Sequence, residues 1–433
     1  MTTVLTHPSN PARPPLRTCS LCGDSECMKL LYDFGHVPVA GYLESTREVA
    51  LEAPRFHLGI AICRKTGLVQ QAYVEGREVL IKKVYANYQP TYSMSERVVS
   101  YMGSFLDRSM QGAGVMPKDR VLEIGSNDGH VLRLLRNRGL HPIGFEPSSS
   151  LAAASRDAGL EVVQDYFGLE SARRFIGAHV PAKLLITRHT LEHAFDPLDF
   201  LRGIEVVLAH DGLAVIEVPY VRLQMMNGHF EAMTFQHVSF FSVASMVEAL
   251  TRAGLSAVDV SFVSMDGGSM VIFARKTRRC PGARAVTIDA ALELESLYAL
   301  NTCEAYHSYF RRMDCLRANV KSYLNRLAQK GQRILGYGAG GKGQALLGIL
   351  ELGSTEIALV IDDVPGNAGK FIPGTGIEIV SSRDSRAQMV DVMLLTAPTH
   401  IQEIVHKEAW RLAHGTRFMA TVPDFHQPML STL

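Results

Sequence analysis

The stretch Val121-Leu-Glu-Ile-Gly-Ser-Asn-Asp-Gly-His130 decides the fold of this chain. Its first four residues predict a buried parallel strand, and the glycine after them predicts a sharp turn. The apolar face of a helix follows, formed by Val131, Leu132, Leu134 and Leu135. Gly125 allows the backbone to approach a ligand closely, and Gly129 allows the helix to begin tight against the strand. This order of elements predicts an open α/β sheet that binds a ligand at its strand ends.

Acidic residues end three successive predicted strands. Glu123 ends the first strand, Glu146 ends a second at residues 141–147, and Asp165 ends a third at residues 162–167. A carboxylate at the second tip can accept hydrogen bonds from both hydroxyls of a ribose. The acid at the third tip would then lie near an adenine. These positions favour a nucleoside-like cofactor.

This arrangement resembles a class I S-adenosylmethionine (SAM) methyltransferase. The resemblance implies a cofactor site made of Glu123, Gly125, Asn127, Asp128, Gly129, Glu146, Asp165 and His189. The alternative is an NAD site. It is less favoured, because the turn lacks the full G-x-G-x-x-G pattern and has Asn127-Asp128 where a pyrophosphate would need neutral backbone amides.

Length and composition limit the possible classes of protein. The chain has 433 residues, enough for two or three domains, with 47% hydrophobic residues, 20% charged residues and a net charge of +1. No basic face for nucleic acid is indicated, and no apolar run approaches the roughly 20 residues that span a bilayer. Residues 1–17 contain prolines and no apolar core, so we expect no secretory signal. Seven cysteines without such a signal favour a reducing cytoplasm.

Cysteines near the N-terminus suggest a metal site. Cys19-Ser-Leu-Cys22 has the C-x-x-C spacing of two zinc ligands, and Cys63 offers a third. The same spacing places a fourth ligand at Thr66, whose hydroxyl is a poor zinc ligand. Candidates to replace it are Cys27, His36 and His57, and spacing does not select one. A zinc-ribbon scaffold that has lost its metal is the alternative. Short strands around residues 34–42 and 67–71 indicate a small β-rich module.

Three later segments supply candidates for chemistry. The loop at residues 85–95 is rich in tyrosine and either covers a polar substrate or packs as a linker. Residues 188–193 leave the tip of a fourth strand, which makes His189, Glu192 and His193 candidates. His237 lies among aromatic residues, where a neutral imidazole is either a general base or a structural group bonded to backbone.

The C-terminal part predicts a second α/β unit. Residues 288–329 have an uninterrupted helical pattern and predict one or two long helices. Gly336, Gly338 and Gly341 then form G-x-G-x-x-G between a strand and a helix, with Asp362 about 20 residues further on. Taken alone, this pattern predicts a dinucleotide or phosphate site. A P-loop is disfavoured, because Gly343 stands where Ser or Thr must hold magnesium.

Three features together resemble one family, the SAM-dependent C-methyltransferases of deoxysugar biosynthesis. They are the N-terminal cysteines with Gly67-Leu-Val-Gln70, the central glycine turn at residues 122–129, and the tail at residues 336–343 with Asp362-Asp363 and Pro373-Gly-Thr375. The resemblance covers nearly the whole chain. It implies a zinc-ribbon-like module at 18–85, a Rossmann-like methyltransferase domain at 86–277, and a helical linker with a second Rossmann-like domain at 278–433.

The resemblance also implies a reaction. The substrate would be a small molecule, a nucleotide-linked 4-keto-deoxysugar of the dTDP type, and an enzyme base would remove the proton beside the ketone. The resulting enolate would take the methyl group of SAM. His237 would be the base, Tyr88 and His193 would line the acceptor pocket, and Gln236 would lie beside the base. The tail domain would complete the substrate cleft without NAD. The chain would act as a monomer or homodimer.

Three departures from the family pattern bear on the acceptor. Thr66 replaces a zinc cysteine, Gln236 replaces a glutamate beside the base, and Thr234 replaces a common tyrosine. A lost tyrosine removes a donor to the enolate oxygen, and one such donor contributes roughly 3 kcal/mol. Methylation of another natural product at carbon, nitrogen or oxygen therefore remains an alternative. Two others are an NAD-linked oxidoreductase or epimerase and a scaffold that binds its ligand without turnover.

Overall fold

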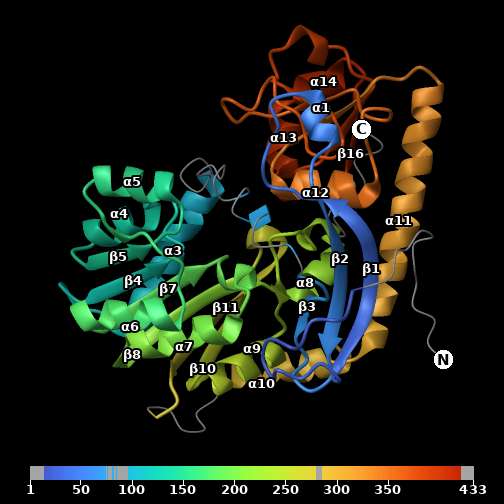
Figure 1. Ribbon diagram of the computed structural model, residues 1–433. Coiled ribbons are helices and arrows are strands. Elements are labelled where there is room, and N and C mark those ends of the chain that lie inside the picture. Colours follow the sequence, from blue (N-terminus) through green and yellow to red (C-terminus); the bar gives the residue numbers. More distant parts are fainter. Residues whose placement is uncertain are drawn as a thin grey trace.

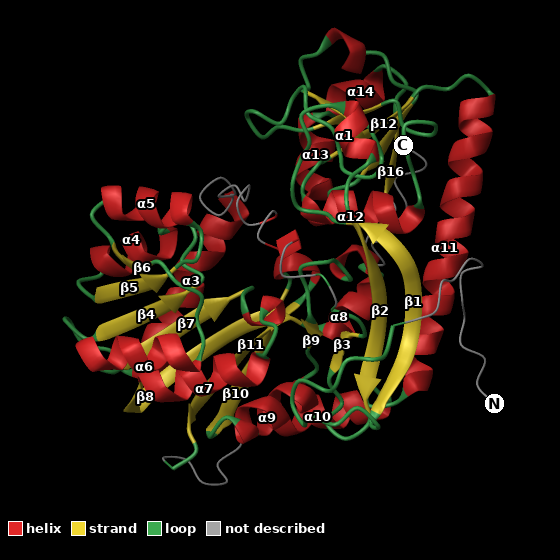
Figure 2. Ribbon diagram, viewed as in Figure 1, coloured by secondary structure: helices red, strands yellow, loops and turns green. Residues whose placement is uncertain are grey.

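The computed structural model describes residues 14–278 and 285–420, except residues 75, 77–79, 82–83 and 85–95. Within these residues the chain forms three parts, each built on its own β-sheet (Figure 1). The central part has seven strands, the N-terminal part four and the C-terminal part five. In Figure 2 the strands β1 (Met28–Pro38) and β2 (Arg55–Cys63) of the N-terminal part run beside α11 (Cys303–Gln329) toward α12 (Gly341–Leu350) of the C-terminal part.

The central sheet has the strand order β10–β11–β8–β7–β4–β5–β6. Neighbours among β4 to β8 pair in parallel, and β11 is antiparallel to both β8 and β10. The strands are β4 (Arg120–Ile124), β5 (His141–Phe145), β6 (Glu161–Val163), β7 (Ala182–Arg188), β8 (Leu208–Pro219), β10 (Leu255–Val263) and β11 (Ser269–Lys276). The expected α/β core, including its last antiparallel strand, is confirmed.

This strand order fixes where a ligand binds. From β4 the chain moves outward to β5 and β6, and it then returns to the other side of β4 to form β7 and β8. The order therefore reverses between β4 and β7. In open α/β sheets the crevice outside the carboxyl ends of the strands at such a reversal is the ligand site.

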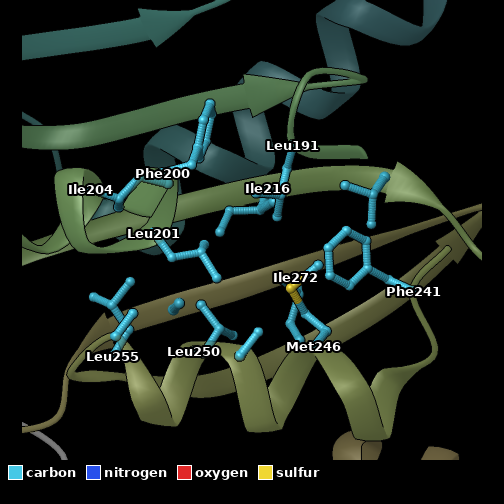
Figure 3. Close-up of a cluster of buried hydrophobic side chains, with 14 of the residues drawn as sticks. Leu191, Phe200, Leu201, Ile204, Ile216, Phe241, Met246, Leu250, Leu255 and Ile272 are labelled. Atoms are coloured by element: carbon cyan, nitrogen blue, oxygen red, sulfur yellow. The ribbon is translucent and has the colours of Figure 1, made fainter. Parts of the chain in front are cut away.

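Helices cover both faces of the central sheet. In Figure 1, α3, α4 and α5 lie on one side and α6 and α7 on the other. The helices are α3 (Glu96–Ala113), α4 (His130–Asn137), α5 (Ser149–Asp157), α6 (Leu169–Ala178), α7 (Pro197–Val207), α8 (Val221–Asn227) and α9 (Val243–Arg252). Figure 3 shows the apolar side chains of α7 and α9 packed against those of β8 and β11, including Leu201, Leu250, Ile216 and Ile272.

The N-terminal sheet has the order β1–β2–β3–β9. Its strands are β1 (Met28–Pro38), β2 (Arg55–Cys63), β3 (Val69–Gln71) and β9 (Ser239–Phe240), and α1 (Arg47–Leu51) lies between β1 and β2. The expected strand at residues 67–71 is present, whereas the one at 34–42 is the end of a longer strand and β2 was not anticipated. The last strand, β9, comes from the segment between α8 and α9.

Two helices connect the central and C-terminal parts. α10 (Val286–Leu297) packs against α9 and β10, and α11 (Cys303–Gln329) packs against β1 and α12. They confirm the helical pattern expected there. No helix in the described part of the chain is long and apolar enough to cross a membrane.

The C-terminal sheet has five parallel strands in the order β14–β13–β12–β15–β16. They are β12 (Ile334–Tyr337), β13 (Leu359–Ile361), β14 (Glu378–Val380), β15 (Val392–Leu395) and β16 (Arg417–Ala420), with α12 (Gly341–Leu350), α13 (Ile401–Lys407) and α14 (Ala409–Ala413). The predicted glycine turn connects β12 to α12, so this part is Rossmann-like as expected.

Candidate active site

A cavity of about 430 Å³ lies at the carboxyl ends of β4, β5 and β7, where the strand order reverses. Seven of the residues named from the sequence line it: Gly125, Asn127, Glu146, Asp165, His189, His193 and Gln236. Glu123, Asp128, Gly129 and His237 are not among its lining residues. The catalytic candidate Tyr88 lies outside the described residues.

The turn after β4 needs glycine at both predicted positions. Gly125 has a φ of 77°, and a Cβ there would lie 2.3 Å from Oγ1 of Thr190. Gly129 has a φ of 71°, and a Cβ there would lie 2.5 Å from Leu160. Asp128 accepts a hydrogen bond from the amide of His130 at 3.1 Å, so it holds the start of α4. Residues of this turn therefore form part of the cavity wall.

Glu146 fixes the second wall of the cavity. Its carboxylate accepts hydrogen bonds from the amides of Asn127 and Ser148, both at 2.9 Å. Burial raises the pKa of Glu146, and the two amide donors oppose that shift. The same side chain thus lines the cavity and holds the glycine turn of β4 in place.

The other two acids have different surroundings. Asp165 lines the cavity and forms a 2.7 Å ion pair with Arg174. Glu123 is buried, and its Oε2 has no hydrogen-bond partner among the described residues. Burial raises the pKa of Glu123 well above the ordinary value for a glutamate.

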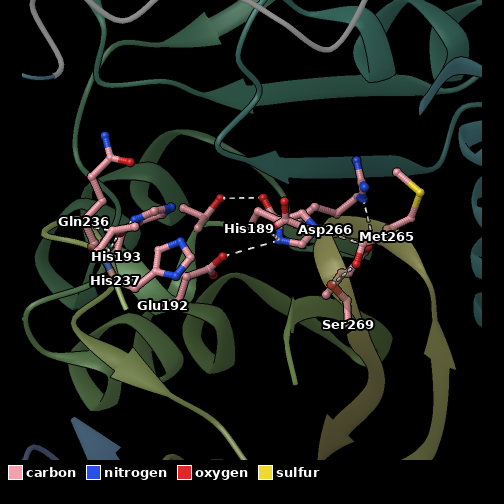
Figure 4. A network of polar contacts seen from close by, with 12 residues as sticks. His189, Glu192, His193, Gln236, His237, Met265, Asp266 and Ser269 are labelled. Atoms are coloured by element: carbon pink, nitrogen blue, oxygen red, sulfur yellow. Dashed lines mark hydrogen bonds and ion pairs between the residues drawn. The ribbon is translucent and has the colours of Figure 1, made fainter. Parts of the chain in front are cut away.

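A network of buried charges follows β7 (Figure 4). His189 has a φ of 48°, and its amide donates to the carbonyl of Glu217 at 2.9 Å. Its ring nitrogens lie 3.3 Å from the carboxylate of Glu217, 3.4 Å from Glu192 and 3.7 Å from Asp266. Although burial lowers the pKa of His189, the carboxylates raise it to about 10. His189 is therefore a cation near neutral pH.

Glu217 and Asp266 each connect His189 to further residues. Glu217 accepts from Nε of Arg188 at 2.5 Å and from the hydroxyl of Tyr101 at 3.1 Å. Asp266 forms an ion pair with Nζ of Lys342, at the start of α12. A residue of the C-terminal part thus contacts the central site directly.

The segment that carries His237 is held by the N-terminal sheet. Nε2 of Gln71, in β3, donates to the carbonyls of Thr234 and His237 at 2.8 Å and to that of Phe235 at 3.3 Å. Oγ1 of Thr234 accepts from the amides of Gln236 and His237 at 3.2 and 3.4 Å. Thr234 therefore stabilises the turn itself.

The buried His237 and the half-buried His193 lie side by side. Their ring centroids lie 5.0 Å apart with an interplanar angle of 64°, and Nδ1 of His193 donates to the carbonyl of Gln236 at 3.0 Å. One carboxylate oxygen of Glu192 and one ring nitrogen of each histidine all lie within 4.8 Å of one another. Burial, followed by the neighbouring His193, lowers the pKa of His237 to about 3. Its imidazole is neutral and able to accept a proton.

Among the candidates to replace Thr66, Cys27 lies beside two of the other cysteines. Sγ of Cys27 lies 3.1 Å from that of Cys63 and 3.6 Å from that of Cys22, while Cys22 and Cys63 are 3.8 Å apart. The sulfur atoms of Cys19, Cys22 and Cys63 lie within 4.8 Å of one another. A tetrahedral zinc with Zn–S bonds of about 2.3 Å needs sulfur separations of about 3.8 Å. Cys22 and Cys63 have this separation, whereas Cys27 lies closer to Cys63 and is outside the group of three.

The two histidine candidates for that position lie elsewhere. His36 and His57 pair across β1 and β2, eight residues along β1 from the end where Met28 pairs with Cys63. Eight residues of strand span roughly 26 Å. The ring of His57 instead contacts Asp33 at 2.7 Å.

The C-terminal glycine turn has its own internal partners. Asp362 accepts from the amide of Ala339 at 2.7 Å, and from Val364 and Asn367 at 2.9 Å each. These donors occupy the carboxylate that a ribose would need in a dinucleotide site. Gln344, in α12, accepts from the amide of Gly41 at 2.8 Å. The turn is thus also a contact with the N-terminal part.

Sequence reasoning missed three residues of the site. They are Gln71, Arg188 and Glu217, all of which are buried. Glu217 could have been identified from the sequence, because it is the one acid within the apolar run of β8 at residues 213–218. Gln71 had no comparable signal, since its partners lie more than 160 residues away.

Comparisons with known proteins agree with this architecture. Residues 93–260 match the family described as methyltransferase domain, and residues 264–423 match the C-methyltransferase C-terminal domain. The chain is 29% identical over 410 residues to the C-methyltransferase NovU of Streptomyces niveus, covering 95% of this chain and 96% of that protein.

Part of the chain is similar to solved structures, two of which are methyltransferases. The 1,6-didemethyltoxoflavin-N1-methyltransferase of Burkholderia thailandensis is 15% identical, covering 48% of this chain and 95% of that one, with a TM-score of 0.36. The magnesium protoporphyrin IX methyltransferase of Synechocystis is 11% identical, covering 47% and 92%, with a TM-score of 0.33.

The central fold, its cavity and the matching methyltransferase domain define a class I SAM-dependent methyltransferase. Within that class, the chain carries a C-methyltransferase C-terminal domain and is similar over nearly its whole length to a C-methyltransferase.

Proposed function

We propose that this enzyme methylates the carbon beside the ketone of a nucleotide-linked keto-deoxysugar of the dTDP type. The observation that carries the proposal is the pair of His193 and His237 next to the cavity at the carboxyl ends of β4 and β7. A C-methyltransferase must remove a proton from carbon, and a neutral imidazole can take that proton where a nearby carboxylate stabilises the cation that forms. The C-methyltransferase relative supports carbon as the methylated atom.

The cavity walls supply the site for the methyl donor in this proposal. The turn at Gly125 and Asn127 would contact the donor, Glu146 would receive its ribose hydroxyls, and Asp165 would lie near its adenine. When bound, SAM supplies a methyl group that its sulfonium already makes electrophilic. The protein therefore has to hold donor and acceptor at reacting distance and exclude water.

His237 performs the proton transfer. Its free ring nitrogen would take the proton from the carbon beside the ketone, and the electron pair left behind would form the enolate. The enolate carbon would bond to the methyl group of SAM as the sulfur–methyl bond breaks, which leaves S-adenosylhomocysteine. The proton stays on the imidazole until it passes to solvent after transfer. His193, whose Nδ1 is already donated to Gln236, presents its other ring nitrogen to the acceptor pocket.

The reaction is tested with methyl-¹³C-labelled SAM and a dTDP-linked 4-keto-6-deoxysugar. We expect a product that is one methyl group heavier, with carbon–carbon coupling between the label and the sugar ring. Label on oxygen or nitrogen, or transfer only to acceptors without a nucleotide, would contradict the proposal.

A variant tests the base. His237→Ala should lower kcat by roughly 10²–10⁴-fold, the usual contribution of a general base, because no other group takes the proton. Its affinity for S-adenosylhomocysteine, measured by calorimetry, should be unchanged. His141→Ala, at an exposed histidine that begins β5, is the control and should behave like the wild type.

The N-terminal module holds zinc in this proposal, with Cys27 in place of Thr66. The thiolates of Cys19, Cys22, Cys27 and Cys63 would surround the ion and tie the start of β1 to the end of β2. Structural zinc contributes directly to folding free energy. Cys27→Ser should therefore lose zinc by elemental analysis and unfold at a lower temperature.

The matched control is Thr66→Ser, which keeps a hydroxyl at the position where a fourth cysteine was expected from the spacing. It should retain one zinc ion per chain. Full zinc content in Cys27→Ser would remove Cys27 from the ligand set.

A further inference from the structure

The residue beside His237 cannot serve as its charged partner. Gln236 is neutral, its carbonyl accepts from His193, and its side chain lines the cavity. An imidazole that accepts a proton in a buried site becomes a cation, which is costly unless a carboxylate lies nearby. Any such carboxylate must therefore come from another element of the fold.

Glu192 is placed to supply it. The residue lies in η2 (Leu191–His193), one turn after β7, and is only 1% exposed. Its carboxylate forms a 3.4 Å ion pair with His189 but accepts no hydrogen bond within the described residues, and buried polar atoms are seldom left without one. One of these oxygens lies within 4.8 Å of ring nitrogens of both His193 and His237.

The backbone fixes this proximity. The amide of Val238 donates to the carbonyl of Glu192 at 2.7 Å, which joins η2 to the segment that carries His237. Figure 4 shows Glu192 between the ring of His237 on one side and that of His189 on the other. The segments that carry Glu192 and His237 are thus joined directly through their backbones.

Glu192 carries a negative charge in this setting. Burial raises the pKa of Glu192, but the three neighbouring histidines together lower it below the ordinary value for a glutamate. His189 contributes most among them, at 3.4 Å. His189 is itself held by Glu217 and by Asp266, which Lys342 neutralises.

We propose that Glu192 is the positioning residue for His237: its buried carboxylate orients the imidazole and stabilises the imidazolium that forms on proton abstraction. The proposal rests on the function proposed above, in which His237 is the base. One ring nitrogen of His237 takes the substrate proton, and the N–H at the other donates to Glu192. Glu192 itself stays ionised throughout, as the carboxylate of a catalytic triad does.

The first test needs no substrate. In protein labelled with ¹⁵N-histidine, the ring signals of His237 are identified by their loss in His237→Asn. We expect one fixed tautomer in the wild type and a mixture of both in Glu192→Leu, which removes the acceptor. The control is Glu231→Leu, at another buried glutamate paired with a histidine, His229, which should leave the His237 signals unchanged.

The second test separates charge from shape. Glu192→Gln keeps the size of the side chain and should lower kcat by at least about 10²-fold, with KM for SAM unchanged. Gln236→Glu in the same chain should restore part of that loss, because it returns a carboxylate beside His237. A merely structural role for Glu192 would not be rescued by a charge at a different position.

The outcomes distinguish this inference from the proposed function. Unchanged His237 ring signals in Glu192→Leu, or wild-type kcat in Glu192→Gln, would overturn it. So would a divalent metal ion that the wild type binds and Glu192→Gln loses, since the three side chains would then be metal ligands. If no keto-sugar is methylated but the tautomer is lost in Glu192→Leu, the pairing stands and the proposed substrate is wrong.

Discussion

At the scale of single residues, adding one methyl group at Gly125 should strongly weaken ligand binding in the cavity. Gly125→Ala places a methyl group 2.3 Å from Oγ1 of Thr190, on the wall of the cavity, at a positive φ. The turn must then move away from the position that the donor needs. We expect the affinity for S-adenosylhomocysteine, measured by calorimetry, to fall at least tenfold, which corresponds to about 1.4 kcal/mol.

Gly139→Ala provides the matched control. Gly139 has a φ of 79°, almost that of Gly125, but a Cβ there would meet no atom within 4 Å. Both variants carry the backbone strain of roughly 1–2 kcal/mol, and only one alters the cavity. Equal loss of affinity in the two variants would show that strain, and not the clash, is responsible.

Individual residues were predictable where a backbone rule applied. The glycines of the turn and the acids at the strand tips follow from the strand–turn–helix pattern, which fixes their places relative to the sheet. Glu217 and Gln71 were not predictable in the same way. Their roles depend on which side chain meets them after folding, and chain distance gives no guide to that.

At the scale of elements, β3 supports the segment that carries His237. Gln71→Leu removes the donor to three carbonyls at residues 234, 235 and 237 and leaves those buried groups without it. Each unsatisfied buried polar group costs about 1–3 kcal/mol. We expect a lower free energy of unfolding in urea and a fall in kcat together, because the histidine loses its fixed position.

The neighbouring glutamine is the control for this prediction. Gln70 points to the opposite face of β3, where its side chain bonds Thr18 and Ser20. Gln70→Leu should lower stability with little change in kcat. Similar kcat values in the two variants would mean that the hydrogen bonds from Gln71 to residues 234, 235 and 237 do not affect turnover.

Elements with strong periodicity were predictable, and elements assembled from distant segments were not. The strands of the central sheet and the long helices follow from runs of apolar residues. The two-residue strand β9 has no such run, and it exists because residues 239–240 lie beside Val69 and Gln70 after folding.

At the scale of the whole molecule, Lys342 joins the C-terminal part to the site. Its ion pair with Asp266 has side chains that are 23% and 30% exposed. Lys342→Met removes the closer of the two cations beside Asp266 and leaves it with the 3.7 Å ion pair to His189. We expect the free energy of unfolding to fall by about 1–3 kcal/mol and kcat/KM to fall with it.

Lys407→Met tests whether any lost lysine would have this effect. Lys407 pairs with Asp363 inside the C-terminal part, and its side chain is 49% exposed, so the change should stay within about 0.5 kcal/mol. An equal loss of kcat/KM in both variants would contradict a specific role for Lys342. The sequence placed this lysine in a glycine turn typical of phosphate binding, but the turn could not reveal a partner in another domain.

The pairing of β9 with β3 has a consequence for biosynthesis. The N-terminal sheet can form completely only after residue 240 has been synthesised, although its other three strands lie within the first 71 residues. Until then the edge of β3 is open, and open edges invite pairing with other nascent chains. Pairing between strands so far apart in the chain is slow. We therefore expect the N-terminal segment to fold together with the rest of the enzyme and not as an independent unit that could be replaced.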